Sequence, residues 1–330
     1  KIVFPFFGKS LFDFSVRDVL PKEVSRAVII AVRNNRDALG AVGLPIPSVT
    51  VLQQKPLGMA DALLAAASEI AGSELVILIA DDLTDSGLIK RVVARGRTSG
   101  AFGVIPGWKT ERYFPGGYLK IENHRIVGIT EKPGEGKAPS PYVAISGHYV
   151  RSSDVLLGEL TRTGTTGGDD AYERALTTIA QHEEFVMEPY EGNFVSLKYP
   201  WHVLDGMEYL LSRLASHRGK GVSICDHVVI EGNVYLDDGV KIFENTKIVG
   251  PCYIGKNTIV PAKKTLTVPV FCVEHGRWDN SGKEFTTANA LAHGRLRGSA
   301  NFDTQSDVWK EVAKKNELRN TKSSTDTYRT

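Results

Sequence analysis

Hydrophobic residues in the first half of the chain alternate between short continuous runs and segments with helical spacing. The continuous runs are bounded by glycine, proline or charge and so predict buried strands; they are Ile2–Phe4, Ala27–Val32, Val49–Leu52, Leu75–Ile79 and Ala101–Ile105. Asp61–Ala71 is rich in helix formers, and Asp85 stands where an N-cap would be for a helix running to Arg95. This alternation predicts an α/β fold with a Rossmann-like, mostly parallel sheet, whose ligands bind at the carboxyl ends of the strands.

The pattern changes at Gly117, where two strand-like segments flank a short turn. Tyr118–Glu122 and Ile126–Glu131 predict a hairpin, and Tyr142–Val150 predicts a further strand beyond a Pro/Gly-rich loop. The sheet is therefore expected to carry an antiparallel insertion. Two further helices are predicted, over Asp169–Ile179 and Trp201–Leu214.

Aliphatic residues then recur at every sixth position. They are Ile224, Ile230, Leu236, Ile242, Ile248, Ile254 and Val260, and a small or β-branched residue stands two places before each of the last six. This spacing predicts hexapeptide β-helix repeats. So short a solenoid has exposed apolar ends, so it is expected to pack against a neighbouring domain or a second subunit in a homo-oligomer.

The six-residue period is expected to stop after Val260. Thr267–Val273 predicts a strand, Ser306–Asn316 an amphipathic helix, and Arg319–Thr330 a polar tail, which together suggest a small α+β region. We therefore expect three domains, over residues 1–216, 222–260 and 261–330.

Composition narrows the function to small-molecule chemistry. The 330 residues carry 40 Lys and Arg against 38 Asp and Glu, a net charge of +2, which argues against nucleic-acid binding through a broad basic face. The apolar runs are far shorter than the roughly 20 residues that span a bilayer, so no membrane helix is expected. The first residues hold no signal-peptide core, and three cysteines without C-x-x-C spacing favour a reducing, cytoplasmic location.

Five segments occur in the order found in one known family. They are Gln53–Leu63, Val76–Leu83, Ile129–Pro133, Tyr142–Tyr149 and Tyr199–Leu204. With the hexads, residues 1–260 resemble sugar-1-phosphate nucleotidyltransferases that carry a left-handed β-helix behind the catalytic domain. The resemblance implies that a sugar-1-phosphate attacks the α-phosphorus of a nucleoside triphosphate and that pyrophosphate leaves. Such a reaction needs charge neutralisation and in-line positioning more than covalent catalysis.

Charged residues after two of the predicted strands are the candidate catalytic groups. Asp81 follows a hydrophobic strand, where its carboxylate can hold Mg²⁺ against the triphosphate, and Asp82 is the second candidate ligand. The alternative for these carboxylates is helix N-capping. Lys132 carries a point charge suited to the sugar phosphate, and Glu131 is placed to contact sugar hydroxyls; the alternative for this pair is a solvated turn.

Three further positions depend on the resemblance. It implies that Gln53 reads the edge of the base, and that Gly58 lets a base or phosphate approach the backbone at the start of a helix. It also places Gly147 beneath the sugar. The alternative for each glycine is an ordinary turn.

Two departures from the family favour a second hypothesis. The Gly-rich triphosphate loop is not found after Lys1–Pro5, so we expect omitted residues near Pro5–Phe6 and, similarly, at the end of the hexads near Val260–Pro261. Ser196 stands where many relatives have a second metal-binding Asp, and His202 replaces another Asp. The alternative is therefore a catalytically impaired member that binds a nucleotide or sugar nucleotide in a regulatory or scaffold role.

A third hypothesis, acetyl transfer on the hexads, is disfavoured because the hexads contain no obvious catalytic His. The tail resembles a second family, the ARPP-type domains, whose function is uncharacterised. The segments that carry this resemblance are Val268–Trp278, Asp303–Trp309 and Ser323–Arg329. Cys272 and His275 suggest a metal pair, but without a second pair a structural role is favoured. The tail therefore predicts no reaction.

Overall fold

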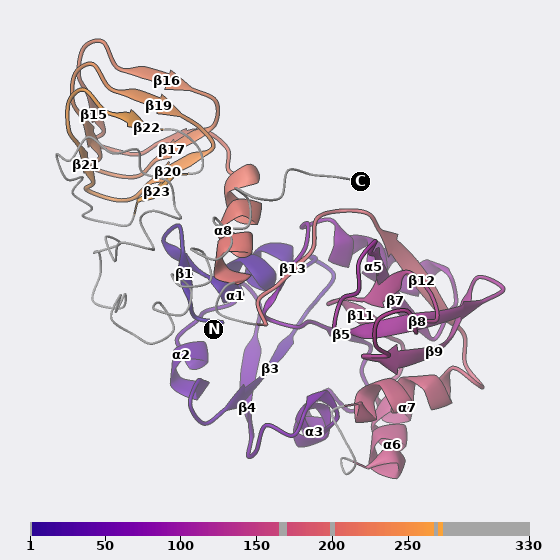
Figure 1. Cartoon of the computed structure of the whole chain (residues 1–330). Coiled ribbons are helices and arrows are strands. Elements are labelled where there is room, and N and C mark those ends of the chain that lie inside the picture. The colour runs from indigo at the N-terminus through magenta and orange to yellow at the C-terminus, as the bar shows by residue number, and fades with distance from the viewer. Residues whose placement is uncertain (1, 165–169, 199–201, 267–269, 273–330) are drawn as a thin grey trace. The chain divides into compact units, whose positions relative to one another are not determined.

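The computed structural model describes residues 2–164, 170–198, 202–266 and 270–272, and the chain divides into two compact units (Figure 1). Unit 1 comprises Lys1–Phe4 and Ser10–Phe194, and unit 2 comprises Pro5–Lys9 and Val195–Thr330.

Unit 1 is built around a seven-stranded sheet. Its strand order is β10 (Tyr142–Ala144), β8 (Gly117–Glu122), β9 (Arg125–Glu131), β12 (Phe185–Tyr190), β7 (Gly103–Lys109), β11 (His148–Val150) and β5 (Leu75–Ile77). β7 and β12 pair in parallel, whereas the other described pairings of this sheet are antiparallel. The expectation of a mostly parallel sheet is therefore wrong for these seven strands. The reason is that β11 runs antiparallel between β5 and β7, and the β8–β9 hairpin adds further antiparallel pairs.

Two more strands of unit 1 form a separate parallel pair. β3 (Ala27–Val32) lies beside β4 (Ser48–Gln53), and their last residues, Val32 and Gln53, are in register. The continuous β-branched run of Ala27–Val32 thus forms the predicted strand.

Helices cover both faces of the large sheet. On one face α5 (Leu88–Thr98) buries Leu88, Ile89, Val92 and Val93 against the sheet, at the spacing of one helical face. On the other face lie α3 (Met59–Ala65), α6 (Ser153–Thr163) and α7 (Ala171–Ile179), packed around Phe102, Ile105 and Phe185.

Two helix boundaries differ from the prediction. The helix expected over Asp61–Ala71 is interrupted at Ala66, which separates α3 from α4 (Ala67–Ile70). The N-cap of α5 is Gly87 and not Asp85. The Asp85 carboxylate instead accepts a hydrogen bond of 2.9 Å from the Gly87 N–H, just before the helix begins.

The N-terminal segment does not form the predicted strand. Ile2 and Val3 lie in a turn, and the carbonyls of Ile2 and Phe4 accept hydrogen bonds from the first residues of α1 (Leu11–Ser15). β1 (Pro5–Phe6) continues directly from this turn and pairs with β2 (Lys9–Ser10) through a two-residue loop. The omission expected near Pro5–Phe6 stays a prediction. η1 (Arg17–Val19) and α2 (Arg36–Gly40) complete this region.

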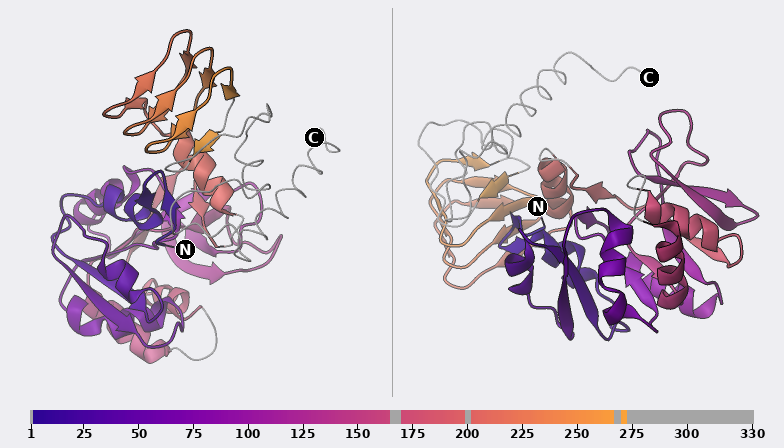
Figure 2. Two further views of the ribbon diagram at one scale, coloured as in Figure 1. Left: turned by 90° about the vertical axis from the view of Figure 1, so that its left-hand side faces the viewer. Right: turned by 90° about the horizontal axis from the view of Figure 1, so that it is seen from below.

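Unit 2 contains three parallel sheets that the chain visits in rotation, which we call the repeat region (residues 217–272) (Figure 2). The first holds β14 (His217–Arg218), β17 (Val234–Leu236), β20 (Cys252–Ile254) and β23 (Val270–Cys272). The second holds β15 (Ser223–Ile224), β18 (Lys241–Ile242) and β21 (Ile259–Val260), and the third β16 (Val229–Glu231), β19 (Lys247–Val249) and β22 (Thr265–Leu266). Most of the predicted hexad residues are buried in one shared core.

The repeat continues beyond its predicted end at Val260. Leu266 pairs with Ile248, and Cys272 pairs with Ile254. Both residues keep the six-residue spacing, which the polar segment 261–264 obscures in the sequence. The break expected near Val260–Pro261 is therefore not found, because β21 and β22 belong to successive sides of the same stack.

An aromatic stack runs along one side of the repeat region. The ring of Tyr235 lies 4.5 Å from His217 and 5.3 Å from Tyr253, centroid to centroid, and Phe7 in the β1–β2 turn lies 5.0 Å from Tyr253. Burial raises the pKa of the Cys252 thiol to about 12, so this cysteine is a core residue and not a reactive thiol.

The remaining short elements are β6 (Asp82–Leu83) in unit 1 and β13 (Val195–Ser196) and α8 (His202–Ser212) in unit 2. Several sequence predictions fall outside the described residues. They are the helix over Ser306–Asn316, the tail from Arg319, His275 of the Cys272–His275 pair, and most of the ARPP-like segment.

Candidate functional site

Gln53 holds the loop between β4 and α3 in a fixed conformation. Its side-chain Nε2 donates hydrogen bonds to the Gly58 carbonyl (3.1 Å) and to Oδ2 of Asp61 (2.8 Å), and only 7% of the residue is exposed. Gly58 is the N-cap of α3 with a φ of 93°, which glycine adopts without strain. The structure thus brings two predicted site residues, Gln53 and Gly58, into contact.

The carboxylate pair lies just after β5. Asp81 is half-buried in a turn, whereas Asp82 begins β6 and is only 5% exposed. This turn lies beside the β10–β11 connection, because Ser146 Oγ accepts a hydrogen bond from the Ile79 N–H (2.7 Å) and the Gly147 N–H donates to the Ile77 carbonyl (3.0 Å). Asp81 and Gly147 therefore belong to the same end of neighbouring strands.

Gly147 itself needs to be glycine for two structural reasons. Its φ is 109°, and a Cβ built on it would lie 2.4 Å from Cδ1 of Ile89. The ordinary-turn interpretation of this glycine thus has support that does not depend on any ligand.

Glu131 is the last residue of β9 and Lys132 follows it, and the two form an ion pair with 3.0 Å between Lys132 Nζ and Glu131 Oε1. The Lys132 backbone has a φ of 44°, and its N–H donates to the Gly116 carbonyl (3.1 Å). The positive φ of Lys132 is a strained backbone conformation, and it turns the chain out of the sheet. This is the position where the sequence predicts sugar-phosphate binding.

A second carboxylate lies beside this pair and was not found from the sequence. A Cβ placed on Gly117 would lie 3.2 Å from Oε2 of Glu131 and 3.7 Å from Cγ of Glu173, which belongs to α7. No sequence motif marks Glu173. Its position follows from the packing of α7 on β9, where Thr177 Oγ1 accepts a hydrogen bond from the Ile129 N–H (3.0 Å).

His148 is a buried titratable group next to Gly147. Its Nδ1 lies 2.9 Å from the Tyr172 hydroxyl, and among the described residues its Nε2 has no hydrogen-bond partner. Burial lowers the pKa of His148 to about 4, opposed by a hydrogen bond with the Ile145 backbone, and burial together with Glu173 raises the pKa of Tyr172. Both side chains are therefore neutral near pH 7.

Ser196 and His202, the two departures from the family pattern, contact each other. The His202 ring nitrogen Nδ1 lies 2.7 Å from the Ser196 carbonyl, and Ser196 is 6% exposed on β13. His202, the first residue of α8, thus ties that helix to the preceding strand.

The described residues do not form a complete metal cage. Among them, no group of three or more His, Cys, Asp or Glu side chains could hold a metal ion. Mg²⁺ is commonly held by only one or two carboxylates together with substrate phosphates, so the half-buried Asp81 fits this mode better than the buried Asp82.

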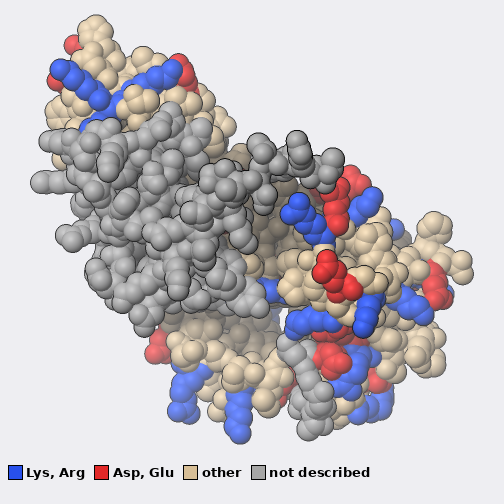
Figure 3. Space-filling model, in the orientation of Figure 1, with Lys and Arg blue, Asp and Glu red and all other residues tan. Residues whose placement is uncertain are grey.

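Surface charge and hydropathy add two observations. In Figure 3, blue Lys and Arg and red Asp and Glu side chains are interspersed on the visible described surface. Within the described ranges, no helix has the length and apolarity needed to cross a membrane.

Comparison with known proteins identifies the class. The Nucleotidyl transferase family matches residues 1–202, well over half of the chain, and the chain belongs to this family. The ARG and Rhodanese-Phosphatase-superfamily-associated Protein domain, ARPP-1, matches residues 253–330. No curated protein matches the chain.

Solved structures of nucleotide-sugar enzymes have a similar fold. A UDP-glucose pyrophosphorylase complexed with UDP-glucose has a TM-score of 0.56 at 16% identity, over 64% of this chain and 90% of that chain. UTP-bound UGPase from Acinetobacter baumannii has a TM-score of 0.55 at 16% identity, over 64% and 86%. A putative glucose-1-phosphate thymidylyltransferase from Bacillus anthracis in complex with a sucrose has 0.53 at 16%, over 63% and 85%. At these identities the likeness establishes the Rossmann-like nucleotidyltransferase core.

Proposed function

We propose that this protein transfers a nucleotidyl group from a nucleoside triphosphate to a sugar-1-phosphate and releases pyrophosphate and an NDP-sugar. The observation that carries the proposal is the family match over residues 1–202, which spans every candidate site residue. One of the similar structures is complexed with UDP-glucose and another is UTP-bound, which supports a nucleotide and a sugar phosphate as the substrate classes.

Gln53 would read the base through its carbonyl oxygen. Both hydrogens of its amide group have acceptors, Gly58 O and Asp61 Oδ2, so Oε1 is the atom left for a ligand. A carbonyl oxygen accepts hydrogen bonds. The base is therefore expected to present an N–H donor to Oε1, while Gly58 provides the close backbone approach.

Asp81 would hold Mg²⁺ together with triphosphate oxygens, and the bound metal would neutralise negative charge on the phosphates. Asp82, which is buried, would orient the turn or serve as a second ligand. Because Asp81 and Gly147 lie at the same end of neighbouring strands, the sugar above Gly147 would face the metal-bound phosphates.

Lys132 would neutralise the phosphate of the incoming sugar-1-phosphate, and Glu131 would bind sugar hydroxyls. Their ion pair holds the Lys132 ammonium at the end of β9 in the absence of substrate. Glu173 adds a carboxylate next to Glu131, and we include it among the groups that would contact the sugar.

We interpret the repeat region as a left-handed β-helix behind the catalytic domain. An offset of 18 residues between paired strands, such as Ser223 with Lys241, equals three hexads per coil. Val229, Ile230 and Phe243 are large exposed apolar residues on this region, and they support association of the β-helix with a second copy in a homo-oligomer. A reducing, cytoplasmic location remains part of this proposal.

The second candidate function is nucleotide or sugar-nucleotide binding without turnover. Two observations favour it: residues 1–26 hold a single glycine, Gly8, which lies in the β1–β2 turn, and Ser196 is a buried strand residue without a carboxylate. A regulatory or scaffold role would then involve the repeat region and the ARPP-1 segment.

Pyrophosphate release separates the two functions. The full chain is incubated with Mg²⁺ and a panel of nucleoside triphosphates, each with several sugar-1-phosphates, and NDP-sugar is measured in parallel. Release that requires both substrates supports the transferase, and the triphosphate that gives the highest rate identifies the base. Saturable binding of UDP-glucose without any release would support the second function instead.

A further inference from the structure

Two polar side chains form a pair inside the otherwise apolar core of unit 1. His148, the first residue of β11, is 5% exposed, and Tyr172, in the first turn of α7, is 1% exposed. Nδ1 of His148 lies 2.9 Å from the Tyr172 hydroxyl, and the two rings stack at an angle of 19° with their centroids 5.7 Å apart. The pair therefore joins a strand of the large sheet to a helix that covers it.

Packing alone does not account for this pair. Tyr172 belongs to an apolar cluster that includes Leu156, Leu160 and Phe185. Among the described residues, Nε2 of His148 has no hydrogen-bond partner, and a buried polar atom without a partner lowers stability. Two apolar side chains of similar shape would avoid that cost. The pair therefore needs an explanation other than stability.

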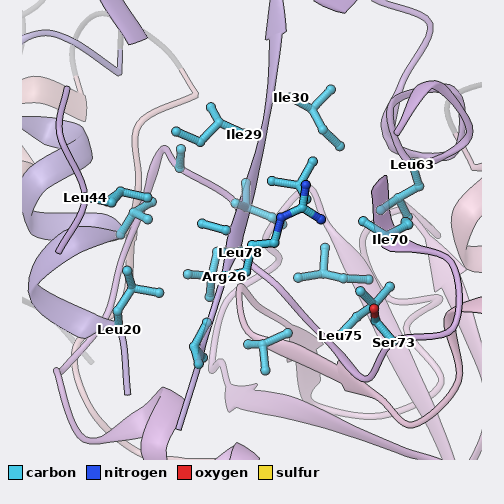
Figure 4. Close-up of a pocket in the computed structure, with 18 of the residues that line it drawn as sticks. Leu20, Arg26, Ile29, Ile30, Leu44, Leu63, Ile70, Ser73, Leu75 and Leu78 are labelled. Atoms are coloured by element: carbon cyan, nitrogen blue, oxygen red, sulfur yellow. The ribbon is translucent and has the colours of Figure 1, made fainter. Parts of the chain in front are cut away.

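The pair is not a polar lining for the large cavity of unit 1. This cavity of about 670 Å³ lies beside β3 and β5, and Figure 4 shows its aliphatic lining, which includes Leu63 and Ile70. The described residues that line it include Tyr149 but neither His148 nor Tyr172. Successive residues of a strand point to opposite faces, so His148 points away from Tyr149 and into the core under α7. A ligand in the cavity would not contact the pair.

At one end the pair fixes the backbone next to Gly147. This glycine has a φ of 109°, and its N–H donates to the Ile77 carbonyl (3.0 Å). Glycine leaves the backbone free to rotate, so the orientation of the peptide between Gly147 and His148 depends on what holds the His148 ring. The hydrogen bond and stacking with Tyr172 hold that ring on α7.

At the other end the pair fixes the first turn of α7. Tyr172 is followed by Glu173, whose Cγ would lie 3.7 Å from a Cβ on Gly117, while Oε2 of Glu131 would lie 3.2 Å from the same Cβ. About one turn later, Thr177 bonds to the backbone of β9. A rotation of α7 about its axis would move Glu173 away from Glu131, and the bonds to β11 and to β9 oppose that rotation.

We propose that His148 and Tyr172 are positioning residues that set the spacing between two sides of the sugar site. One side is Gly147, and the other is the pair of carboxylates at the end of β9 and the start of α7. Neither positioning residue touches the substrate, because both are enclosed in the core. The proposal rests on the proposed function, which assigns the sugar to these two sides. Loss of the pair weakens binding of the sugar and leaves binding of the nucleotide unchanged.

Tyr172→Phe tests the proposal, because it removes the hydroxyl and keeps the ring. Calorimetric titration of the full chain compares UDP-glucose with UDP, which lacks the sugar. The ADP, CDP, GDP and dTDP pairs are titrated in the same way, and the NDP-glucose that the parent binds most tightly is used for comparison. We expect its Kd to rise about tenfold, and the Kd of the matching diphosphate to rise less than twofold.

Tyr149→Phe is the matched control for this substitution. Tyr149 follows His148 on β11, and its hydroxyl donates a hydrogen bond to Glu74 (3.0 Å) instead of bonding to α7. The control therefore removes a tyrosine hydroxyl and its hydrogen bond from the same strand but leaves the pair intact. It should change neither Kd.

Two further variants separate positioning from stability. Glutamine in His148→Gln can still bond to the Tyr172 hydroxyl, so the Kd for the NDP-glucose should stay within about threefold of the parent. The double variant His148→Leu/Tyr172→Phe leaves no unpaired polar atom at these two positions. We expect its Tm to equal or exceed that of Tyr172→Phe, while its Kd for the NDP-glucose stays about tenfold above the parent.

Hydrogen exchange tests the positioning without any ligand. The amides of Gly147 and Arg174 are both hydrogen-bonded, and they lie on the two sides that the pair joins. We expect both amides to exchange about tenfold faster in Tyr172→Phe and at the parental rate in Tyr149→Phe.

Three outcomes would overturn the proposal. They are an unchanged Kd for the NDP-glucose in Tyr172→Phe, an equal rise in both Kd values, and parental exchange of the Gly147 and Arg174 amides. A different result would count against the proposed function itself, namely that the parent binds no NDP-glucose more tightly than the matching diphosphate. The exchange comparison would still decide whether the pair positions the two sides, so the two failures are distinguishable.

Discussion

The side-chain nitrogen of Gln53 lies 2.8 Å from Oδ2 of Asp61, so the last residue of β4 is bonded to the first turn of α3. The acceptor fixes which end of the amide is the nitrogen, because a carboxylate cannot donate. Gln53→Leu removes both donated bonds. We expect the free energy of unfolding to fall by about 1–3 kcal/mol and the KM for the triphosphate to rise about tenfold.

Thermal melting and initial rates at varied triphosphate check this expectation. The matched control is Gln54→Leu, the exposed neighbouring glutamine, which should change neither quantity. A stability loss with an unchanged KM would assign Gln53 to the loop alone and remove it from base recognition.

Asp81→Asn tests the metal ligand. The amide keeps the size of the side chain but loses its charge, so we expect kcat to fall by about 100-fold or more while Tm stays within about 2 °C. Asp85→Asn is the control, because Asp85 lies just beyond β6 and engages the Gly87 N–H and Arg91. Rates are measured at several Mg²⁺ concentrations. A variant with the parental rate and Mg²⁺ dependence would exclude Asp81 as the ligand.

Lys132→Ala tests sugar-phosphate binding. Loss of a charged hydrogen-bond donor to phosphate is expected to raise the KM for the sugar-1-phosphate by about 10-fold to 100-fold, with a smaller effect on the triphosphate. Lys120→Ala, which removes an exposed lysine paired with Glu122 on β8, should leave both constants unchanged. If Lys132→Ala changed both KM values equally, its role would be structural.

His148 makes stability depend on pH. Its pKa in the folded protein is about 4, below the ordinary 6.5, so between these values the unfolded chain binds more protons than the folded one. The stabilising contribution is fully present above pH 6.5 and is lost as the pH falls towards 4, by about 3 kcal/mol in total. Urea unfolding across this range is expected to show the decline.

His148→Gln supplies the control for this pH dependence. Glutamine does not titrate but can still hydrogen-bond to the Tyr172 hydroxyl, so the slope between pH 4 and 6.5 should be shallower than in the parent. Identical slopes for the two proteins would assign the acid sensitivity to other groups.

Two helix glycines are expected to respond to alanine with opposite signs. At Gly158 in α6 no atom lies within 4 Å of a built Cβ, so Gly158→Ala should stabilise by up to about 1 kcal/mol through helix propensity. At Gly96 in α5 the Cβ would lie 2.4 Å from Cδ1 of Tyr149, so Gly96→Ala should destabilise by about 1–3 kcal/mol. Calorimetric Tm values that shift in the same direction would contradict the packing of Tyr149 on α5.

The sequence predicts those parts of the fold whose signal is local. Ala27–Val32 forms its strand because its β-branched residues suit a strand, and Ile29 and Ala31 on one face are buried. Ile2–Phe4 has a similar composition but pairs with no strand in the described part of the chain, and the carbonyls of Ile2 and Phe4 bond to α1 instead. A strand depends on its partners, which composition alone does not reveal.

In the candidate site, too, contacts between residues close in sequence were predictable, and contacts that depend on tertiary packing were not. Gln53 and Gly58 are linked in sequence, and the structure links them by a hydrogen bond. Glu173 belongs to helix α7 and Glu131 to strand β9, and the two approach each other only because α7 packs on β9. Such proximity depends on tertiary packing, so it was not predictable from the motif. Whether Asp81, Lys132 and Gly147 act together stays a prediction.

The 18-residue offset in the repeat region sets a rule for changes in chain length. Paired strand residues there lie 18 positions apart along the chain, as Lys241 does from Ser223 and from Ile259. Inserting or deleting one whole coil of 18 residues leaves the pairing of the remaining strands unchanged. Ile242 and the equivalent residues of the other coils then stay buried. A change of one or two residues would rotate all later side chains and expose that core. Changes in chain length in this region are therefore expected to occur in whole coils. Related chains should differ here by multiples of 18 residues, a pattern that can be recognised from sequences alone.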